Sequence, residues 1–326
     1  MSARKDLIGI GGSAGGLPAL RQLLERFHST SPVSMFIVMH RINETGHLLE
    51  ILQASTRLEV CEPKDGEPVR ENCIYLAPPD EHLILGEHHL HRRRGPRENN
   101  FRPAIDPLFR SLAVFGQSRA TGVILSGYLD DGAAGARAIV AGGGTIAVQD
   151  PGEAISPSMP RAAISAVGEP ALIADAGELG SWLSELVATE AGPGIEASKT
   201  VKLEMMIAGL EKATVSSEEQ MGELAPYNCP DCNGVLWRIE DGPLVRFRCH
   251  TGHAYSSTSL ASKQDETLER SLYDLLRSLR ERAILLRDIA EREPQSREHF
   301  LRRADAYDQD ADTIESLILS RGSKAA

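Results

Sequence analysis

The stretch DLIGIGGSAGG, residues 6–16, joins a short apolar run to a glycine-rich turn, and a helical pattern follows over residues 17–27. This order predicts a buried strand, a sharp turn and a helix, because glycine tolerates backbone angles that other residues avoid. Ser13 is then expected at the carboxyl end of the strand, beside the amino end of the helix. Backbone N–H groups and the helix dipole favour negative charge there, which suits a serine nucleophile whose attack creates an oxyanion.

Alternating strands and helices extend from this stretch to about residue 188. The expected strands are apolar throughout, which is typical of strands that are buried on both faces of a sheet. The predicted fold class is therefore α/β, a doubly wound and mostly parallel sheet with helices on both sides. Strands are expected at residues 35–39, 73–76, 83–85, 121–125 and 145–148, and helices at 47–54, 106–114, 132–141 and 182–187.

Composition and charge narrow the class of protein. The chain has 326 residues, of which 41% are hydrophobic and 25% charged, so it is globular rather than disordered. Its formal net charge of −11 argues against a nucleic-acid binder. The basic stretch HHLHRRRGPR, residues 88–97, is expected to be a solvated loop or strand edge, with docking of an acidic partner as the alternative. The sequence has no signal-peptide pattern and no apolar run of membrane-spanning length, which indicates a cytoplasmic protein.

The glycine-rich turn allows three interpretations. Residues 9–14 fit the dinucleotide pattern G-x-G-x-x-A, but the next strand ends at Met39-His40-Arg41 instead of an acidic residue that would bind a ribose. Residues 11–15 fit G-x-S-x-G, the nucleophile elbow of α/β-hydrolases, although that fold places its serine later in the chain. The third interpretation is a tight turn without chemistry.

Two further polar residues follow buried strands. His40 comes directly after the second strand, and Asp131 follows the strand at 121–125 through a short loop. The carboxyl edge of an open α/β sheet is where ligands bind, so Ser13 would attack a carbonyl, His40 would take its proton, and Asp131 would orient the imidazole. A structural histidine and a turn or N-cap aspartate remain open, and Asp130 competes for the acidic role.

Several motifs in order give residues 5–190 a resemblance to the catalytic domain of the CheB family, the chemotaxis receptor methylesterases: DLIGIGGSAGG, FIVMH, APPDEHLIL, RPAIDPLFRSLA, GVILSGYLDDGAAG and AVQDPGEAISPSMPRAAI. The resemblance implies a doubly wound α/β fold and hydrolysis of glutamate γ-methyl esters on receptor signalling helices, with glutamine deamidation in some members. It assigns the nucleophile to Ser13, the base to His40 and the orienting acid to Asp131, and so favours Asp131 over Asp130.

The sequence departs from the family pattern in several places. Residues 13–16 read Ser-Ala-Gly-Gly where the family often has Ser-Thr-Gly-Gly. Tyr128 and Leu129 stand in the loop that reads Gly-Met-Gly-x-Asp-Gly in the family, and they are expected to reshape the pocket wall and the substrate preference. The catalytic strand begins at residue 6, so the receiver domain that usually precedes the catalytic domain is expected to be absent. Phosphorylation of a receiver would then control this protein only through a separate partner protein.

A cysteine and histidine cluster lies nearer the carboxyl end. Cys229 and Cys232 form a C-x2-C pair, and a hairpin pattern separates them from the stretch Cys249-His250-Thr-Gly-His253. Two such pairs around a hairpin are typical of a zinc ribbon, because thiolates and imidazole suit tetrahedral Zn²⁺. His253 is favoured over His250, since the gap after Cys249 lets the chain turn back onto the metal. Four protein ligands leave no open position, so the zinc is expected to be structural, and catalysis is expected to need no cofactor.

The expected organisation is a catalytic domain over residues 1–189, a linker over 190–225, a zinc-ribbon-like β module over 226–256 and an α-helical hairpin tail over 257–326. The first hypothesis is a protein-glutamate methylesterase whose activity falls below about pH 6.5, where a free imidazole gains a proton. Its expected partners are methylated receptor signalling helices and a separate response regulator or methyltransferase. The second hypothesis is a non-catalytic signalling adaptor that docks through the zinc module and the tail. The amphipathic tail leaves the oligomeric state open.

Overall fold

The computed structural model describes residues 3–40, 47–210 and 222–322. These residues form two compact units, one that ends at Leu260 and one that begins at Ala261, and each is described by itself. Within the expected linker, residues 211–221 lie outside the described part of the chain, as do residues 1–2 and 323–326 at the ends.

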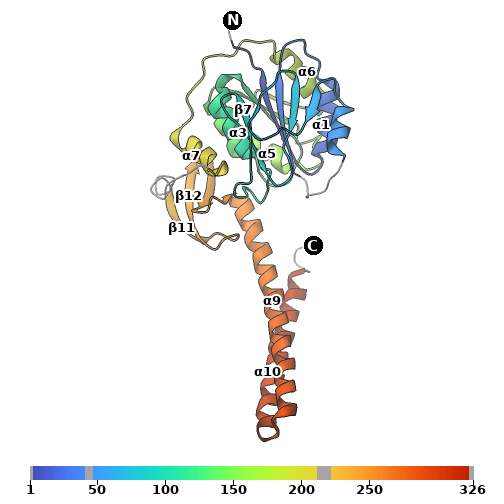
Figure 1. Ribbon diagram of the computed structural model, residues 1–326, viewed down its shortest axis with the longest axis vertical. Coiled ribbons are helices and arrows are strands. Elements are labelled where there is room, and N and C mark those ends of the chain that lie inside the picture. The colour runs from blue at the N-terminus through green and yellow to red at the C-terminus, as the bar shows by residue number, and fades with distance from the viewer. Residues whose placement is uncertain (1–2, 41–46, 211–221, 323–326) are drawn as a thin grey trace. The chain divides into compact units, whose positions relative to one another are not determined.

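A seven-stranded sheet forms the centre of the first unit (Figure 1). Every pairing in this sheet is parallel, which confirms the predicted fold class. The strand order reverses direction at β1, and ligands of open α/β sheets bind at such a switch point. The order across the sheet is β10 (Leu172–Ala174), β9 (Thr145–Gln149), β8 (Ala120–Ile124), β1 (Leu7–Gly12), β2 (Ser34–Met39), β5 (Cys73–Leu76) and β3 (Glu59–Cys61).

Helices cover both faces of this sheet, and each face has its own apolar layer. Strands β1 and β2 are buried along their whole length, because side chains that alternate along each strand enter both layers. One layer includes apolar residues of α1 (Gly16–Arg26), α2 (Leu48–Gln53) and α6 (Ala176–Leu186). The other includes residues of α3 (Ile105–Ser111), the π-helical turn Leu112–Gly116, α4 (Ala133–Ala141) and α5 (Ser158–Val167).

The glycines of β1 have a packing role. A Cβ added at Gly9 would lie 2.5 Å from a Leu112 side-chain atom, and one added at Gly11 would lie 2.6 Å from Ile105. Since real side chains avoid such distances, a larger residue at either position would require the Leu112 or Ile105 side chain to move. Packing therefore gives a reason for Gly9 and Gly11, two of the positions that fit a dinucleotide pattern.

A three-stranded antiparallel sheet lies beside the larger one, in the order β4 (Glu67–Pro68), β7 (His89–Arg93) and β6 (His82–Leu85). The prediction of a solvated loop or strand edge for the basic stretch is wrong here, because β7 is the middle strand. Its Leu90 is buried, and two of its arginines pair with carboxylates of the same unit, Arg92 with Glu81 at 2.6 Å and Arg93 with Asp65 at 2.5 Å.

The remaining part of the first unit is a four-stranded antiparallel sheet, which we call the ribbon: β11 (Glu223–Asn228), β12 (Val235–Asp241), β13 (Leu244–Cys249) and β14 (Ala254–Ser256). The predicted hairpin is confirmed, and its turn is formed by Gly242 and Pro243, one residue later than expected. Helix α7 (Lys199–Ala208) precedes the ribbon, and its Ile207 packs on Ile239 of β12.

The second unit is a helical hairpin of α9 (Ser257–Arg292), whose first turn belongs to the first unit, and α10 (Arg297–Gly322). Ala283 and Leu286 of α9 form a small apolar core with Ala304 of α10. An ion pair of 2.9 Å joins Arg280 to Glu315 across the hairpin. Within the ranges that the structure describes, we find no helix with the length and apolar character needed to cross a bilayer.

Candidate active site

Three strands end next to one another at the carboxyl edge of the parallel sheet. Gly12, the last residue of β1, pairs with the last residue of β2, and its carbonyl accepts a hydrogen bond of 3.0 Å from the backbone N–H of His40. On the other side of β1, the backbone N–H of Ser13 donates to the carbonyl of Ser126 at 2.9 Å, just beyond the end of β8. Ser13 and His40 are thus the first residues after two neighbouring strands, as predicted.

Asp131 forms a buried pair with His40. The distance between His40 Nε2 and Asp131 Oδ2 is 2.7 Å, and the two side chains are 2% and 0% exposed. The carboxylate also accepts hydrogen bonds from Asn99 Nδ2 at 3.0 Å, from the backbone N–H of Ile105 at 2.7 Å and from that of Asp106 at 3.3 Å. Burial alone would raise the pKa of Asp131, but the bond to His40 and the other donors outweigh burial and hold the pKa below its usual value.

A second buried carboxyl group, Asp106, lies beside this pair. The side-chain amide of Asn99 donates to both Asp106 and Asp131. Burial and the negative charge of Asp131 raise the pKa of Asp106 to about 7. The two carboxyl groups therefore lose their protons at different pH, and Asp131 carries the negative charge that faces the imidazole.

The bond to Asp131 decides which nitrogen of His40 can act as a base. An ionised carboxylate only accepts hydrogen bonds, so neutral His40 holds its proton on Nε2 and leaves a lone pair on Nδ1. Nδ1 is buried and has no hydrogen-bond partner among the described residues. The ring of Phe101 stacks on the imidazole at 3.7 Å between centroids and 12° between planes, which fixes the plane of the base.

Hydrogen bonds between neighbouring loops hold the turn that carries Ser13. Ser126 Oγ donates to the carbonyl of Ala14 at 2.7 Å and accepts from the backbone N–H of Ser156 at 2.8 Å. A Cβ added at Gly127 would lie 2.9 Å from Ser13 Cβ, so the loop after β8 closely approaches the serine. Within the described residues no hydrogen bond joins Ser13 Oγ to His40. Such bonds are often long in unliganded enzymes and shorten when substrate binds.

The structure also separates the two neighbouring aspartates. Asp130 Oδ1 accepts from Ser256 Oγ at 2.7 Å, and Asp130 Oδ2 accepts from Thr258, whereas Asp131 alone bonds His40. Asn99 and Phe101 were not anticipated from the sequence. Both lie on the irregular segment between β7 and α3, where no periodicity singles them out.

A separate cluster of metal-ligand type lies in the ribbon. Cys229, Cys232, Cys249 and His253 each offer one ligand atom, and these atoms lie within 4.8 Å of one another. Three of the separations are 3.6 Å: Cys232 Sγ to Cys249 Sγ, and His253 Nδ1 to the sulfurs of Cys229 and Cys249. A tetrahedron with bonds of about 2.3 Å to sulfur and 2.0 Å to nitrogen has edges of about 3.5 to 3.8 Å. The cluster therefore has the donor set and the dimensions of a tetrahedral metal site.

The chain around this cluster is shaped to bring the four groups together. Gly252 has a φ of +99°, a conformation that favours glycine, and its N–H donates to the Cys249 carbonyl at 2.8 Å. This turn returns His253 to the cysteines. The side chain of His250 instead lies over Gly234, where an added Cβ would meet the imidazole at 2.2 Å.

The parallel sheet, with the His–Asp pair at its carboxyl edge, defines an α/β protein of the doubly wound class. Comparison with known families makes the class specific: the family described as CheB methylesterase matches residues 8–183, more than half of the chain. The chain belongs to that family.

Relatives and a solved structure agree with this membership. A protein from Rhizobium johnstonii named protein-glutamate methylesterase/protein-glutamine glutaminase 2 is 34% identical over 164 residues, 49% of this chain and 45% of that protein. One from Paramagnetospirillum magneticum, named protein-glutamate methylesterase/protein-glutamine glutaminase 1, is 32% identical over 189 residues, 56% of this chain and 49% of that protein. The chain thus spans about half the length of these curated relatives. The crystal structure of the Thermotoga maritima CheB methylesterase catalytic domain matches 57% of this chain and all of its own, with 28% identity and a TM-score of 0.53.

Proposed function

We propose that the protein is a serine esterase that removes methyl groups from glutamate γ-methyl esters of chemotaxis-type receptors. The observation that carries this proposal is the buried hydrogen bond between His40 and Asp131 at the strand end next to Ser13. The names of the curated relatives supply the substrate class, a protein glutamate ester.

In the proposed reaction, Ser13 Oγ attacks the ester carbonyl while His40 Nδ1 takes the hydroxyl proton. Asp131 stabilises the imidazolium that forms, as the orienting acid of a Ser-His-Asp triad does. His40 then gives the proton to the departing methoxide, so methanol leaves and an acyl-enzyme remains. A water molecule activated by His40 releases the glutamate. The amino end of α1, which begins at Gly16, places positive dipole beside the oxyanion.

The same acyl-enzyme would form from a glutamine side chain with loss of ammonia, and the double names of the relatives include this activity. Two large side chains are mostly exposed, Tyr128, next in the chain to Gly127, at 62% and Ile155 at 71%. Ile155 lies against Gly15 of the serine turn. Both side chains are suited to contact an apolar face of a helical substrate, so we assign the receptor-helix preference to them.

For the ribbon cluster we propose a structural Zn²⁺ held by Cys229, Cys232, Cys249 and His253. Three sulfurs and one imidazole are the ligands that Zn²⁺ prefers, and four protein ligands leave no position for a substrate. When bound, the metal would cross-link the two ends of the ribbon hairpin. A cytoplasmic location would keep these cysteines reduced. In this division of labour, residues 1–189 form the catalytic domain, 226–256 the zinc module and 257–326 the helical tail that meets the receptor or a response regulator.

The test compares the parent protein with Ser13→Ala in two assays. The parent is expected to release methanol from methylated receptor fragments and to react at Ser13 with a fluorophosphonate probe, and the variant is expected to do neither while it unfolds at the same temperature. A well-folded parent without methanol release or labelling would indicate the alternative, a non-catalytic signalling adaptor.

A further inference from the structure

The segment between β7 and α3, residues 94–104, borders the proposed catalytic groups on one side. Phe101 stacks on the ring of His40, and the Asn99 side-chain amide donates to Asp131 Oδ1 at 3.0 Å. We call this segment the active-site loop. Its position determines how both the base and the acid are oriented.

The other side of the active-site loop is held by the ribbon and the first turn of α9. The backbone N–H of Asn99 donates to the carbonyl of Ala254 in β14 at 2.8 Å. Its side-chain oxygen accepts from the backbone N–H of Ser256 at 3.0 Å and from Ser259 Oγ at 3.2 Å. One buried amide therefore links the last strand of the ribbon directly to the proposed catalytic acid.

The residue before Asn99 ties the same loop to the ribbon through buried charges. Glu98 binds Arg110 of α3 and, at 2.9 Å, Arg248 of β13. Arg248 also contacts Glu204 of α7 at 3.2 Å, and Arg246 binds Glu204 through two bonds of 2.6 and 3.0 Å. All five residues are buried. Removal of one partner from such a network leaves an uncompensated charge, so the ribbon has one favoured position against the loop.

The ribbon residues that bond to the active-site loop are adjacent in sequence to the residues of the metal-ligand cluster. Arg248 precedes Cys249, and Arg248 Nη1 donates to the carbonyl of Gly252 at 2.8 Å, inside the turn between two ligands. Ala254, which accepts from Asn99, directly follows His253. The turn from Cys249 to His253 must therefore have its observed conformation for the ribbon to form both contacts with the loop, the Arg248–Glu98 ion pair and the bond from Asn99 to Ala254.

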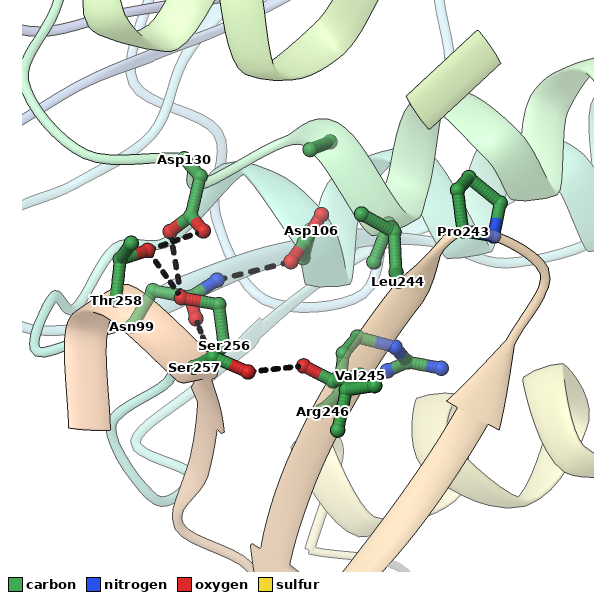
Figure 2. A pocket seen from close by; sticks show the side chains of 12 residues that line it. Asn99, Asp106, Asp130, Pro243, Leu244, Val245, Arg246, Ser256, Ser257 and Thr258 are labelled. Carbon is green, nitrogen blue, oxygen red and sulfur yellow. Dashed lines mark hydrogen bonds between the residues drawn. The ribbon is translucent and has the colours of Figure 1, made fainter. Parts of the chain in front are cut away.

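Directional bonds cross this junction around a cavity. A cavity of about 200 Å³ lies between the ribbon and the start of α4, and Figure 2 shows its lining. On one side Ser256 and Thr258 donate to Asp130, and on another Ser257 Oγ donates to the carbonyl of Val245 at 3.1 Å. Because the space is not filled by side chains, the ribbon could shift if these bonds were lost.

From this arrangement we infer that Asn99 is a positioning residue through which the metal-bound ribbon holds Asp131 and His40 in their catalytic geometry, so that esterase activity depends on metal at the cysteine and histidine cluster. The inference rests on the proposed function for the activity that it controls. The metal itself takes no part in the reaction.

The first test removes the Asn99 side chain and uses its neighbour as a matched control. Asn99 and Asn100 both have left-handed φ, 50° and 73°, so Asn99→Gly and Asn100→Gly each remove an amide without backbone strain. Among the described residues, the side chain of Asn100 bonds only the carbonyl of Ser259, at 3.4 Å. Asn99→Gly is expected to lower kcat and the rate of fluorophosphonate labelling about 10- to 100-fold with little change in KM, the size typical of lost outer-shell support. Asn100→Gly is expected to stay near the parent values.

The second measurement needs no substrate. The His40 Nε2 proton that is hydrogen-bonded to Asp131 gives a downfield resonance in proton NMR. We expect this resonance to disappear in Asn99→Gly and after a chelator removes Zn²⁺, and to return when Zn²⁺ is added to the parent. Metal removal should slow labelling of the parent by about the same factor as the Asn99→Gly substitution does. In the Asn99→Gly variant, metal removal should slow labelling little further, because the effects of two coupled changes are not additive.

The inference is overturned if the folded metal-free protein keeps the parent labelling rate and resonance, or if Asn99→Gly and Asn100→Gly behave alike. Thermal unfolding of each sample checks that the parallel sheet is intact. A metal- and Asn99-dependent resonance in a protein that hydrolyses no ester would overturn the proposed function and leave this link standing.

Discussion

Replacement of Asp131 by asparagine tests the orienting acid most sharply, because every side-chain oxygen position faces hydrogen-bond donors. Oδ2 accepts from His40 Nε2 and the Ile105 N–H, and Oδ1 accepts from Asn99 and the Asp106 N–H. The amide NH₂ of Asp131→Asn must therefore meet donors at either position. If it faces His40, the imidazole changes tautomer and turns an N–H instead of a lone pair toward Ser13.

The expected loss follows from the mechanism. An orienting acid whose loss gives the wrong histidine tautomer costs on the order of 10⁴ in kcat, which is about 5.5 kcal/mol of activation free energy. The assay is methanol release from a methylated receptor fragment, with the rate of fluorophosphonate labelling at Ser13 as a second readout. Both should fall together while KM changes little.

Asp130→Asn is the matched control, since it makes the same change one residue earlier. The Asp130 carboxylate accepts from the hydroxyls of Ser256 and Thr258, and hydroxyls can rotate to accept from an amide instead. Its activity should stay within about threefold of the parent, because each hydroxyl offers both a donor and an acceptor. Equal losses in the two variants, or a parent-like Asp131→Asn, would refute the assignment.

Three further outcomes are expected. Phe101→Ala should lower kcat about fivefold, since a stacked ring contributes about 1 kcal/mol, and Phe101→Leu should recover part of the rate; unchanged kinetics would show that the ring does not orient His40. Glu204→Gln should destabilise the first unit by about 3 kcal/mol in thermal or urea unfolding, because Arg246 loses its bidentate charged partner and Arg248 keeps only Glu98, whereas the same change at exposed Glu240 should have little effect. Burial opposes ionisation of Glu204, but its arginine partners outweigh burial and hold the pKa of Glu204 below its usual value. Its ionised form therefore stabilises the fold above about pH 4.3, and this stabilisation is lost as the pH falls further. Glu204→Gln should flatten the acid side of a plot of unfolding temperature against pH, and a plot parallel to that of the parent would contradict this.

The parallel sheet could be predicted because its physical signal is local. Strands buried on both faces need long apolar runs, and β2 and β8 have them, so their positions and their type follow from the sequence. Strands β3 and β10 have three residues each and were missed, since so short a run shows no pattern. Helix α5 was missed as well, although its Pro160 lies in the first turn, where proline costs little.

The candidate site could be predicted only in part. Ser13, His40 and Asp131 each follow a strand, and a parallel sheet brings strand ends together whatever the loops do, so their shared edge follows from topology. The roles of Asn99 and Phe101 depend on the path of an irregular loop. That path is fixed by Glu98 and by contacts to β14, more than 150 residues later in the chain, and no local pattern encodes a contact of that range.

Buried ion pairs, instead of apolar contacts, join the active-site loop to the ribbon at Glu98. Apolar side chains of similar size would stabilise the junction as well or better, because desolvation of charge is costly. An apolar contact has no preferred direction, however, whereas Glu98 must meet Arg110 on one side and Arg248 on the other. A shift of the ribbon by the width of one side chain would break the pair of Glu98 with Arg248 and leave a buried charge without its partner. The ion-pair network therefore contributes less to the stability of the fold than to the position of the active-site loop. That position places the adjacent Asn99, which in turn holds Asp131 and His40 in the proposed geometry.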